Sequence, residues 1–386
     1  MAVAFEMHFT IERERFVQDV QHVVKAVSSR TTIPILTGLK IVANSDGITL
    51  TGSDSDISIE TFIPLEEEGE QIASIHEQGS IVLQAHFFCR YSQKAAWERN
   101  GACYSRSICC NDPSGSSVFN LNGYDPEEYP RLPQLEENMM FRLQQNMLKN
   151  MIQQTVFAVS TQETRPVLTG VNLELNDDGL VCTATDSHRL AMRKATIEQN
   201  NEELAFSNVV IPGKSLNELN KILEDTTDEV EIVVTDNQVL FKLDNLLFFS
   251  RLLEGKYPVT SNMIPNHSKT SFRLETKPLL HTLERALLLS QKGKTNIINL
   301  KSLGGHQLEI TSVSPEIGKV TENIEAKQIE GEEMRISFNG KNVIDALKVI
   351  DSEEVQILFT GAMSPLVITP TDHDQSLHLV LPIRTY

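Results

Sequence analysis

Asp186, Ser187 and His188 are the three residue types of a hydrolytic triad, and they are adjacent in the chain. We expect them in a β-strand, where neighbouring side chains point to opposite faces, so they cannot relay a proton among themselves. The chain contains neither a G-x-S-x-G nucleophile elbow nor an H-E-x-x-H zinc motif. We therefore expect no catalytic residue and no enzyme, with a hydrolase that uses His188 as an alternative.

Carboxylates and thiols are the other groups that could carry chemistry. Asp54 and Asp56 could act as acid and base, but Asp54 recurs as Asp186 in a later copy of the same pattern, as a turn residue also would. Four of the 5 cysteines lie between Cys89 and Cys110, without the paired C-x2-4-C spacing of a zinc site. We expect no metal and no cofactor. Because the chain lacks a Walker motif, any ATP chemistry would belong to a partner.

The net charge of −18 at first argues against nucleic-acid binding, which usually requires a basic surface. That argument concerns the surface as a whole. A protein that encloses DNA needs positive charge on an inner face only, and its outside can be acidic. The distribution of charge therefore decides the question, and composition alone does not.

The sequence gives no sign of a membrane segment or of export. It has no apolar run long enough to span a bilayer. Charged residues, Glu12 to Arg15, stand where a signal peptide would need an apolar stretch. We expect a cytoplasmic protein without a membrane partner.

The chain contains a long internal repeat. The segment FTIERERFVQDVQHVVKAVSS begins at Phe9, and the similar segment FRLQQNMLKNMIQQTVFAVST begins at Phe141. A third copy, FRLETKPLLHTLERALLLSQ, begins at Phe272, at almost the same spacing from the second. This period is far longer than that of a solenoid repeat, so each copy should be a domain with its own core.

Each copy is expected to contain two helices beside an antiparallel sheet. In the first copy, apolar residues recur at helical spacing between Phe16 and Val27. The segments 40–43 and 48–51 alternate in polarity around a turn at 44–47, which predicts a hairpin. The expected fold class is α+β, and a generic duplicated α+β protein would show the same pattern.

Six motifs resemble the bacterial DNA polymerase III β subunit, the replicative sliding clamp. They are SRTTIPILTGLKI (29–41), TRPVLTG (164–170), TATDSHRLA (183–191), LLEGKYPVTSNMIP (252–265), FNGKNVIDAL (338–347) and LVLPIRTY (379–386). The resemblance implies three DNA-clamp domains, with boundaries expected at 1–138, 139–269 and 270–386. It also implies a head-to-tail homodimer that closes six domains into a ring.

The function implied by this resemblance is topological. The ring would encircle double-stranded DNA without sequence specificity and give processivity to chromosome replication, in association with the nucleoid. Implied partners are the replicative polymerase subunit, a clamp loader, and other proteins with a clamp-binding motif, namely repair polymerases, ligase and mismatch-repair proteins. The alternative is an interaction scaffold that does not bind DNA.

The expected DNA contacts are mostly cations on or beside the repeated helices, where phosphates need Lys and Arg. The resemblance assigns Arg30 to the first domain and the loop 162–167 to the second, where Pro166 and Val167 replace the aromatic residues common in the family. The candidates are Lys25, Arg30, Gln162, Arg165, Lys214, Lys221, Lys277, Arg285, Lys292, Lys341 and Lys348.

The resemblance also implies a site for a short partner peptide that carries a glutamine and apolar residues. The family usually has Gly where Ser187 stands, and often Arg where Asn262 stands. From the sequence alone, Leu168 and Leu381 could equally be core residues. The matching positions are Leu168, Thr185, Ser187, His188, Arg189, Leu190, Pro258, Asn262, Met263, Leu379, Val380, Leu381, Pro382 and Ile383.

The segment 86–115 departs from the repeat. It contains the only tryptophan and shows no β pattern between Trp97 and Pro113. The repeat then resumes, and Tyr129-Pro130 parallels Tyr257-Pro258. A local frameshift in the coding sequence and genuine divergence are both open explanations. If the segment is genuine, we expect a poorly packed strand and inner helix in domain one, and weakened dimerisation.

Overall fold

The computed structural model describes residues 7–29, 31–94, 107–111, 118–132, 139–177, 179–197, 205–290 and 296–384. The chain folds as two compact units. Unit 1 comprises residues 1–145 and 221–252, and unit 2 comprises residues 146–220 and 253–386. The second sequence copy is therefore divided between the two units.

Unit 1 is built on an antiparallel sheet with helices α1 (Arg13–Val24) and α2 (Ala85–Lys94). The short strands β1 (His8–Ile11) and β7 (Ala73–Glu77) pair with each other, as do β5 (Glu66–Glu67) and β6 (Glu70–Gln71). In the described residues the main sheet has the order β11 (Met139–Gln144), β16 (Glu229–Val234), β17 (Gln238–Leu243), β18 (Leu246–Arg251), β4 (Ile57–Pro64), β3 (Gly47–Ser53), β2 (Gly38–Ala43), β8 (Gly79–Gln84), β10 (Val118–Tyr124) and β9 (Ser107–Asn111).

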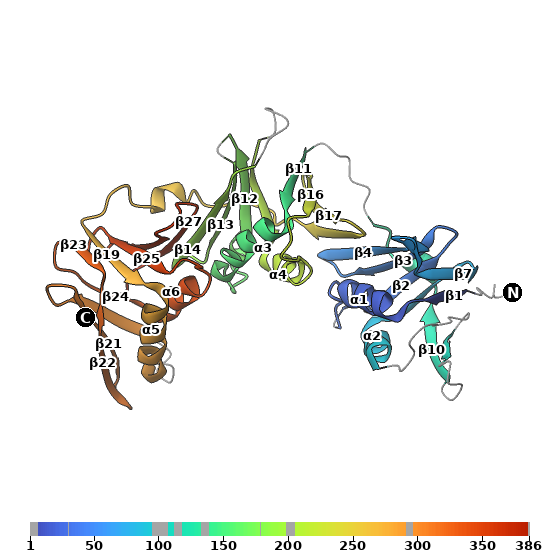
Figure 1. Cartoon of the computed structure of the whole chain (residues 1–386), viewed down its shortest axis with the longest axis horizontal. Helices are drawn as coiled ribbons and strands as arrows, with labels where there is room; N and C mark the ends of the chain where they lie inside the picture. The colour runs from blue at the N-terminus through green and yellow to red at the C-terminus, as the bar shows by residue number, and fades with distance from the viewer. Residues whose placement is uncertain are drawn as a thin grey trace. The chain divides into compact units, whose positions relative to one another are not determined.

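The helices of unit 1 cover one face of this sheet. Every second residue of β4 is buried, from Ile57 to Ile63, because alternate side chains of a strand point to one face. Helix α1 buries Phe16, Val20 and Val23 along one side, and α1 and α2 lie together beside β2–β4 in Figure 1. The predicted hairpin of β2 and β3 is confirmed, with Ala43 paired to Ile48.

Unit 2 contains a second large sheet and a smaller one. The larger sheet has the order β15 (Phe206–Pro212), β12 (Gly170–Asn176), β13 (Gly179–Thr185), β14 (Arg189–Ala195), β27 (Ser376–Val380), β26 (Leu366–Pro370), β25 (Glu354–Phe359), β19 (Thr270–Glu275) and β23 (Gln328–Gly331). The smaller sheet has the order β22 (Gly318–Glu325), β21 (Gln307–Ser314), β20 (Ile297–Ser302) and β24 (Arg335–Asn339). The helices are α3 (Gln145–Gln153), α4 (Gly213–Asn220), α5 (Thr276–Ser290) and α6 (Gly340–Leu347).

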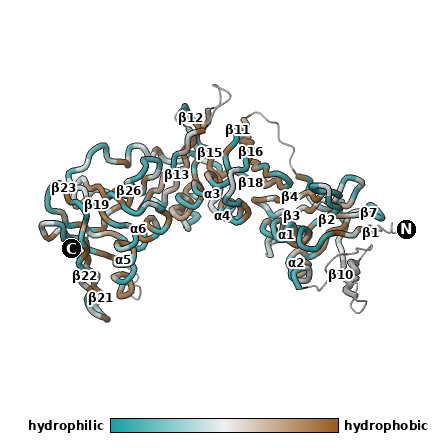
Figure 2. Tube along the Cα trace, in the orientation of Figure 1, coloured by the Kyte–Doolittle hydropathy of each residue, from teal (hydrophilic) through white to brown (hydrophobic). Residues whose placement is uncertain are grey.

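Helices α5 and α6 close the core of the third copy. Leu283 of α5 and Val343 of α6 are buried in one cluster with Phe272 and Phe359 from the large sheet. The two phenylalanine rings lie 4.8 Å apart. Burial of each such side chain stabilises the fold by about 1.5–3 kcal/mol. Figure 2 shows apolar and polar residues intermixed along the strands of unit 2.

The three copies share one plan, as the sequence predicts. A strand leads directly into a helix twice in each copy. The six pairs are β1–α1, β8–α2, β11–α3, β15–α4, β19–α5 and β24–α6. This confirms three tandem α+β domains, each with two helices beside antiparallel strands.

The anomalous segment retains more structure than its sequence indicates. Phe88 of α2 is buried and packs edge-on against Phe16 of α1, with ring centroids 5.9 Å apart. Strand β9 forms inside the stretch without a β pattern and pairs with β10, Cys110 opposite Phe119. The expectation of a poorly packed inner helix is therefore wrong for α2, and β9 forms although its own sequence shows no β pattern. Backbone hydrogen bonding to β10 stabilises β9 although its residues do not alternate in polarity. Residues 95–106 and 112–117 lie outside the described residues.

In the part of the chain that the structure describes, no helix is both long and apolar enough to cross a membrane.

Candidate functional site

The segments expected to bind a partner peptide come together in unit 2. Strand β14 pairs with β27, so Arg189 lies opposite Val380, and Leu190 lies opposite Leu379. Beyond the strand end, the backbone amide of Leu381 donates to the carbonyl of His188 at 2.9 Å. The two halves of the predicted site are far apart in sequence and are nevertheless neighbouring strands.

Tyr257 joins a third segment to this pair of strands. Its hydroxyl accepts a hydrogen bond from the backbone amide of Thr185 at 3.0 Å. Its ring packs in a buried cluster with Leu168 and Val210. This places Pro258, the next residue along the chain, beside the end of β13.

A fourth segment closes the site. Leu190 and Leu379 form a small buried cluster with Val367, and Ile264 packs against it. The 3-10 helix η5 (Ser261–Met263) immediately precedes Ile264 and carries the predicted Asn262 and Met263. The structure thus brings the segments 185–190, 257–264 and 379–381 together in unit 2.

Burial separates these positions into a floor and a rim. The floor is buried by the chain's own side chains and consists of Leu168, Thr185, Leu190, Leu379 and Val380. The exposed positions are Ser187, His188, Asn262, Met263 and Leu381. Arg189, Pro258, Pro382 and Ile383 are half-buried. Leu168 is therefore a core residue and Leu381 a surface residue, which decides the question that the sequence left open for each.

Asp186, Ser187 and His188 form the turn between β13 and β14, and the expectation of a strand here was wrong. One carboxylate oxygen of Asp186 accepts hydrogen bonds from the backbone amides of His188 (2.9 Å) and Arg189 (3.0 Å). Asp54 binds the amides two and three residues ahead of it in the same way. The recurrence of this aspartate in two copies therefore reflects a turn requirement.

Ser187 adopts the left-handed backbone conformation, with φ of 75°. For residues other than glycine this conformation costs roughly 1 kcal/mol. The position therefore favours glycine.

Arg189 is the most highly bonded side chain of the site. Its Nε donates to Asp186 at 3.0 Å, its Nη1 to Asp345 at 2.7 Å, and its Nη2 to the carbonyl of Phe157 at 2.7 Å. Its guanidinium carbon also lies 5.4 Å from the centroid of the Phe157 ring. Asp345 and Phe157 were not predicted from the sequence. The available signal was a lone carboxylate among buried apolar residues of α6.

The candidate DNA contacts lie on helices, at their ends, or in one loop. Lys25 follows α1, Lys214 and Lys221 lie in and just after α4, Lys277 and Arg285 lie in α5, Lys341 lies in α6, and Lys348 follows it. Gln162 and Arg165 are exposed in the loop before the 3-10 helix η4 (Pro166–Thr169). Arg30 and Lys292 lie outside the described residues.

Arg285 and Lys348 are paired with acidic side chains. The Nε of Arg285 lies 3.0 and 3.1 Å from the two carboxylate oxygens of Glu322, and this pairing raises the pKa of Arg285. The Nζ of Lys348 lies 2.9 Å from a carboxylate oxygen of Glu284. Exposed pairs of this kind contribute little stability, so a DNA phosphate could compete for either cation.

Three domains of one family match consecutive parts of the chain. The N-terminal domain of the DNA polymerase III beta subunit matches residues 7–133, the central domain 142–259, and the C-terminal domain 261–384. The chain belongs to the DNA polymerase III beta subunit family.

Curated relatives and solved structures agree with this assignment. The chain is 67% identical over 98% of its length, and over 100% of the relative, to the beta sliding clamp of Halalkalibacterium halodurans. The beta sliding clamp of Bacillus subtilis is 53% identical over the same shares of the two chains. A crystal structure of the Bacillus subtilis sliding clamp superposes with a TM-score of 0.93 at 52% identity and covers 99% of this chain and 100% of its own. A Pseudomonas aeruginosa clamp bound to griselimycin gives a TM-score of 0.89 at 27% identity, covering 98% and 100% of the two chains.

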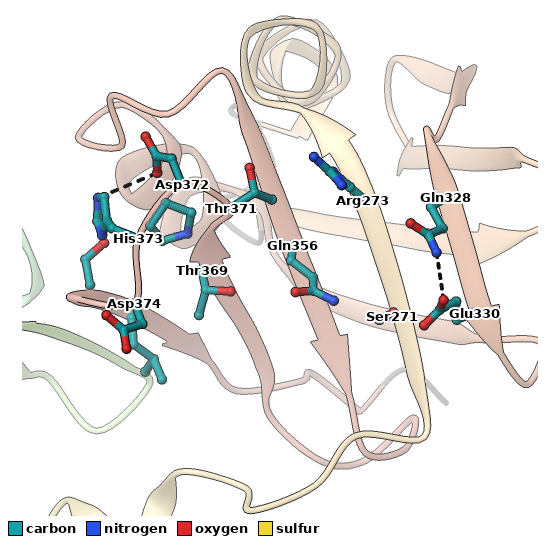
Figure 3. A pocket seen from close by; sticks show the side chains of 13 residues that line it. Ser271, Arg273, Gln328, Glu330, Gln356, Thr369, Thr371, Asp372, His373 and Asp374 are labelled. Atoms are coloured by element: carbon teal, nitrogen blue, oxygen red, sulfur yellow. Dashed lines mark hydrogen bonds and ion pairs between the residues drawn. The ribbon is translucent and has the colours of Figure 1, made fainter.

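This member of the beta subunit family also has a polar hollow that sequence reasoning missed. It has a volume of about 720 Å³ on the larger sheet of unit 2. Figure 3 shows Gln356 and Thr369 on its floor, with Asp372 and His373 on one side and Glu330 on the other. None of the predicted peptide-site residues lines it.

The beta subunit's described residues contain no group of three or more His, Cys, Asp or Glu placed to hold an ion. Cys182 is fully buried, and burial raises the pKa of its thiol to about 12. Cys89 is half-exposed, and burial raises its pKa as well. Both thiols are therefore protonated and poorly nucleophilic at neutral pH.

Proposed function

We propose that two copies of this chain close head to tail into a six-domain ring that encircles duplex DNA and tethers the replicative polymerase. The observation that carries this proposal is the match of all three beta subunit domains, in order, along one chain. The three copies of one strand–helix plan support it, because repeated domains of one shape can close a ring by symmetry. The proposed domain boundaries are 1–138, 139–269 and 270–386.

Free strand edges support the ring. Among the described strands, β9 ends the large sheet of unit 1 and β22 ends the small sheet of unit 2. Each edge offers unpaired backbone groups to another strand, and a head-to-tail contact would join an edge of one subunit to a different edge of its partner. Leu288, near the end of α5, exposes 64% of its surface and would be covered in such a contact.

We propose that the protein acts as a processivity factor and has no catalytic site of its own. The hydrogen bonds of Asp186 support this, because they commit its carboxylate to the turn and to Arg189. The alternatives are a hydrolase that uses His188 and an interaction scaffold that does not bind DNA. Turnover that is lost in His188→Ala would establish the hydrolase.

The rim around Met263 and Leu381 is the proposed peptide site. Its buried apolar floor and its exposed rim, which combines Met263 and Leu381 with polar side chains, suit a short segment with apolar side chains and one glutamine. The proposed partners are the polymerase subunit, the clamp loader, repair polymerases, ligase and mismatch-repair proteins. The proposed location is the cytoplasm, in association with the nucleoid.

A topological experiment tests the ring. The protein is loaded by a clamp loader and ATP onto a nicked circular plasmid, and free protein is removed by gel filtration. We expect retention on the circle and loss after a restriction enzyme linearises it. Equal retention on both forms contradicts encirclement.

Analytical ultracentrifugation provides an independent measurement. A tight dimer supports ring closure and contradicts the expectation of an interface weakened by the segment 86–115. A monomer at micromolar concentration contradicts the ring for this chain.

A further inference from the structure

The guanidinium of Arg189 joins three segments of unit 2 that are far apart in sequence. Each of its three nitrogens donates to a different acceptor, on Asp186, Asp345 and Phe157. The acceptors belong to the β13–β14 turn, to helix α6, and to the 3-10 helix η3 (Val156–Ala158). Since all three nitrogens are engaged at 2.7–3.0 Å, the side chain is held in one orientation.

The surroundings make these bonds strong enough to matter. The side chain of Arg189 is 14% exposed and that of Asp345 is 24% exposed. Charge-assisted hydrogen bonds with limited access to water are stronger than surface ion pairs. The two carboxylates together also outweigh the single positive charge, so the loss of one still leaves Arg189 paired.

Phe157 extends the contact to β27. The Arg189 guanidinium lies over its ring, and the ring lies 5.7 Å from that of His378. His378 is buried in β27, immediately before Leu379 and Val380 of the peptide-site floor. The position of Arg189 is therefore coupled to both strands that form the site.

We propose that Asp345 is a positioning residue for the partner-peptide site, acting through Arg189. Asp345 lies on α6, outside the predicted peptide contacts. It accepts a hydrogen bond from Nη1 of Arg189, whose Nε is bonded to Asp186 in the turn 186–188. The turn is then held in the form that presents Ser187 and His188 at the rim. This inference rests on the proposed peptide site and adds a determinant of its affinity.

The test is a double-mutant cycle on peptide affinity. The probe is a short fluorescent peptide with a glutamine followed by leucine and phenylalanine, and fluorescence polarisation gives its Kd on the full-length protein. We expect Asp345→Asn to weaken binding about tenfold, which corresponds to about 1.4 kcal/mol. In an Arg189→Gln background, Asp345→Asn should have no further effect on the Kd, because the hydrogen bond between Asp345 and Arg189 is already absent.

Glu284→Gln is the matched control. Glu284 lies on α5, and its carboxylate pairs with Lys348, the residue that follows α6. Neutralising this carboxylate should leave the Kd of the peptide unchanged. If Asp345→Asn lowers the thermal midpoint, Asp345→Glu takes its place, because it keeps the charge and displaces it by one methylene. The expected pattern is the same, with weaker binding only when Arg189 is present.

The outcomes distinguish failure of the proposed peptide site from failure of the positioning role of Asp345. If the wild-type protein does not bind the probe, the proposed peptide site fails. If the wild type binds and Asp345→Asn binds equally well, the site stands and the positioning role is overturned. Additive losses in the double mutant, or an equal loss in Glu284→Gln, also overturn it, because they indicate a general loosening of α6.

Discussion

The hydroxyl of Tyr257 accepts a hydrogen bond from the backbone amide of Thr185 at 3.0 Å. The first copy repeats this relationship: Tyr129 is hydrogen-bonded to the backbone of Ser53, the position that corresponds to Thr185 in the repeat. Tyr129 also donates to the carbonyl of Gly38 at 3.2 Å. In both copies a buried tyrosine ties the end of its domain to the strand that precedes the Asp turn.

Tyr257→Phe should destabilise the protein by about 1–3 kcal/mol, because it leaves the buried amide of Thr185 without its acceptor. Urea denaturation followed by circular dichroism measures the change. Tyr124→Phe removes an exposed hydroxyl and is the matched control. Equal stability of the two variants would show that the hydrogen bond is not needed.

His378 should make the protein less stable in mild acid. Burial lowers the pKa of its imidazole from 6.5 to about 4. As pH falls below 6.5, the unfolded chain takes up a proton that the folded chain refuses, so stability falls until about pH 4. Between pH 7 and pH 5, removing this group should reduce the acid-induced loss of stability by about 2 kcal/mol.

His378→Leu is the variant for this measurement, with denaturant unfolding at pH 7 and at pH 5. Neither ring nitrogen of His378 has a hydrogen-bond partner in the described part of the structure, so the substitution leaves no new orphan group. His281→Leu changes an exposed histidine and should keep the wild-type pH dependence. His22, whose pKa burial also lowers to about 4, accounts for part of what remains. An unchanged pH dependence in His378→Leu contradicts the assignment.

Lys341→Ala should weaken binding to duplex DNA and flatten its salt dependence. Each lost phosphate contact reduces the slope of log K against log salt by about 0.9. Lys301→Ala makes the same charge change on strand β20, outside the candidate set, and should keep the wild-type slope. Fluorescence anisotropy over a salt series measures both, and equal slopes in the two variants would remove Lys341 from the DNA contacts.

Met263→Ala should weaken binding of the partner peptide by about 1–2 kcal/mol, because its exposed side chain offers apolar contact at the rim. Met363→Ala truncates another exposed methionine of unit 2, outside the site. Isothermal titration calorimetry with the glutamine-containing peptide compares them. A loss of affinity in Met363→Ala but not in Met263→Ala would contradict a peptide site at Met263.

Local sequence patterns indicate helices and turns because the formation of each depends on residues close together in the chain. The apolar period of Phe16, Val20 and Val23 predicts a helix with one buried face, which α1 has. The recurrence of Asp54 at Asp186 is compatible with a turn residue, and both carboxylates accept hydrogen bonds from the next backbone amides, although the element expected at Asp186 was a strand. Strand β9 shows no β period in its own residues, because its pairing with β10 depends on a neighbouring strand.

The sequence by itself determined the three copies and the strand–helix order in each, because these depend on period, spacing and residue type. The candidate peptide-site residues came from its resemblance to the family. The tertiary structure decided which of those residues can be reached. Leu168 is buried while Leu381 is exposed, since burial depends on what packs against each from distant segments. It also decided that Arg189 is held by Asp345 from a distant part of the chain, a pairing that no local pattern records.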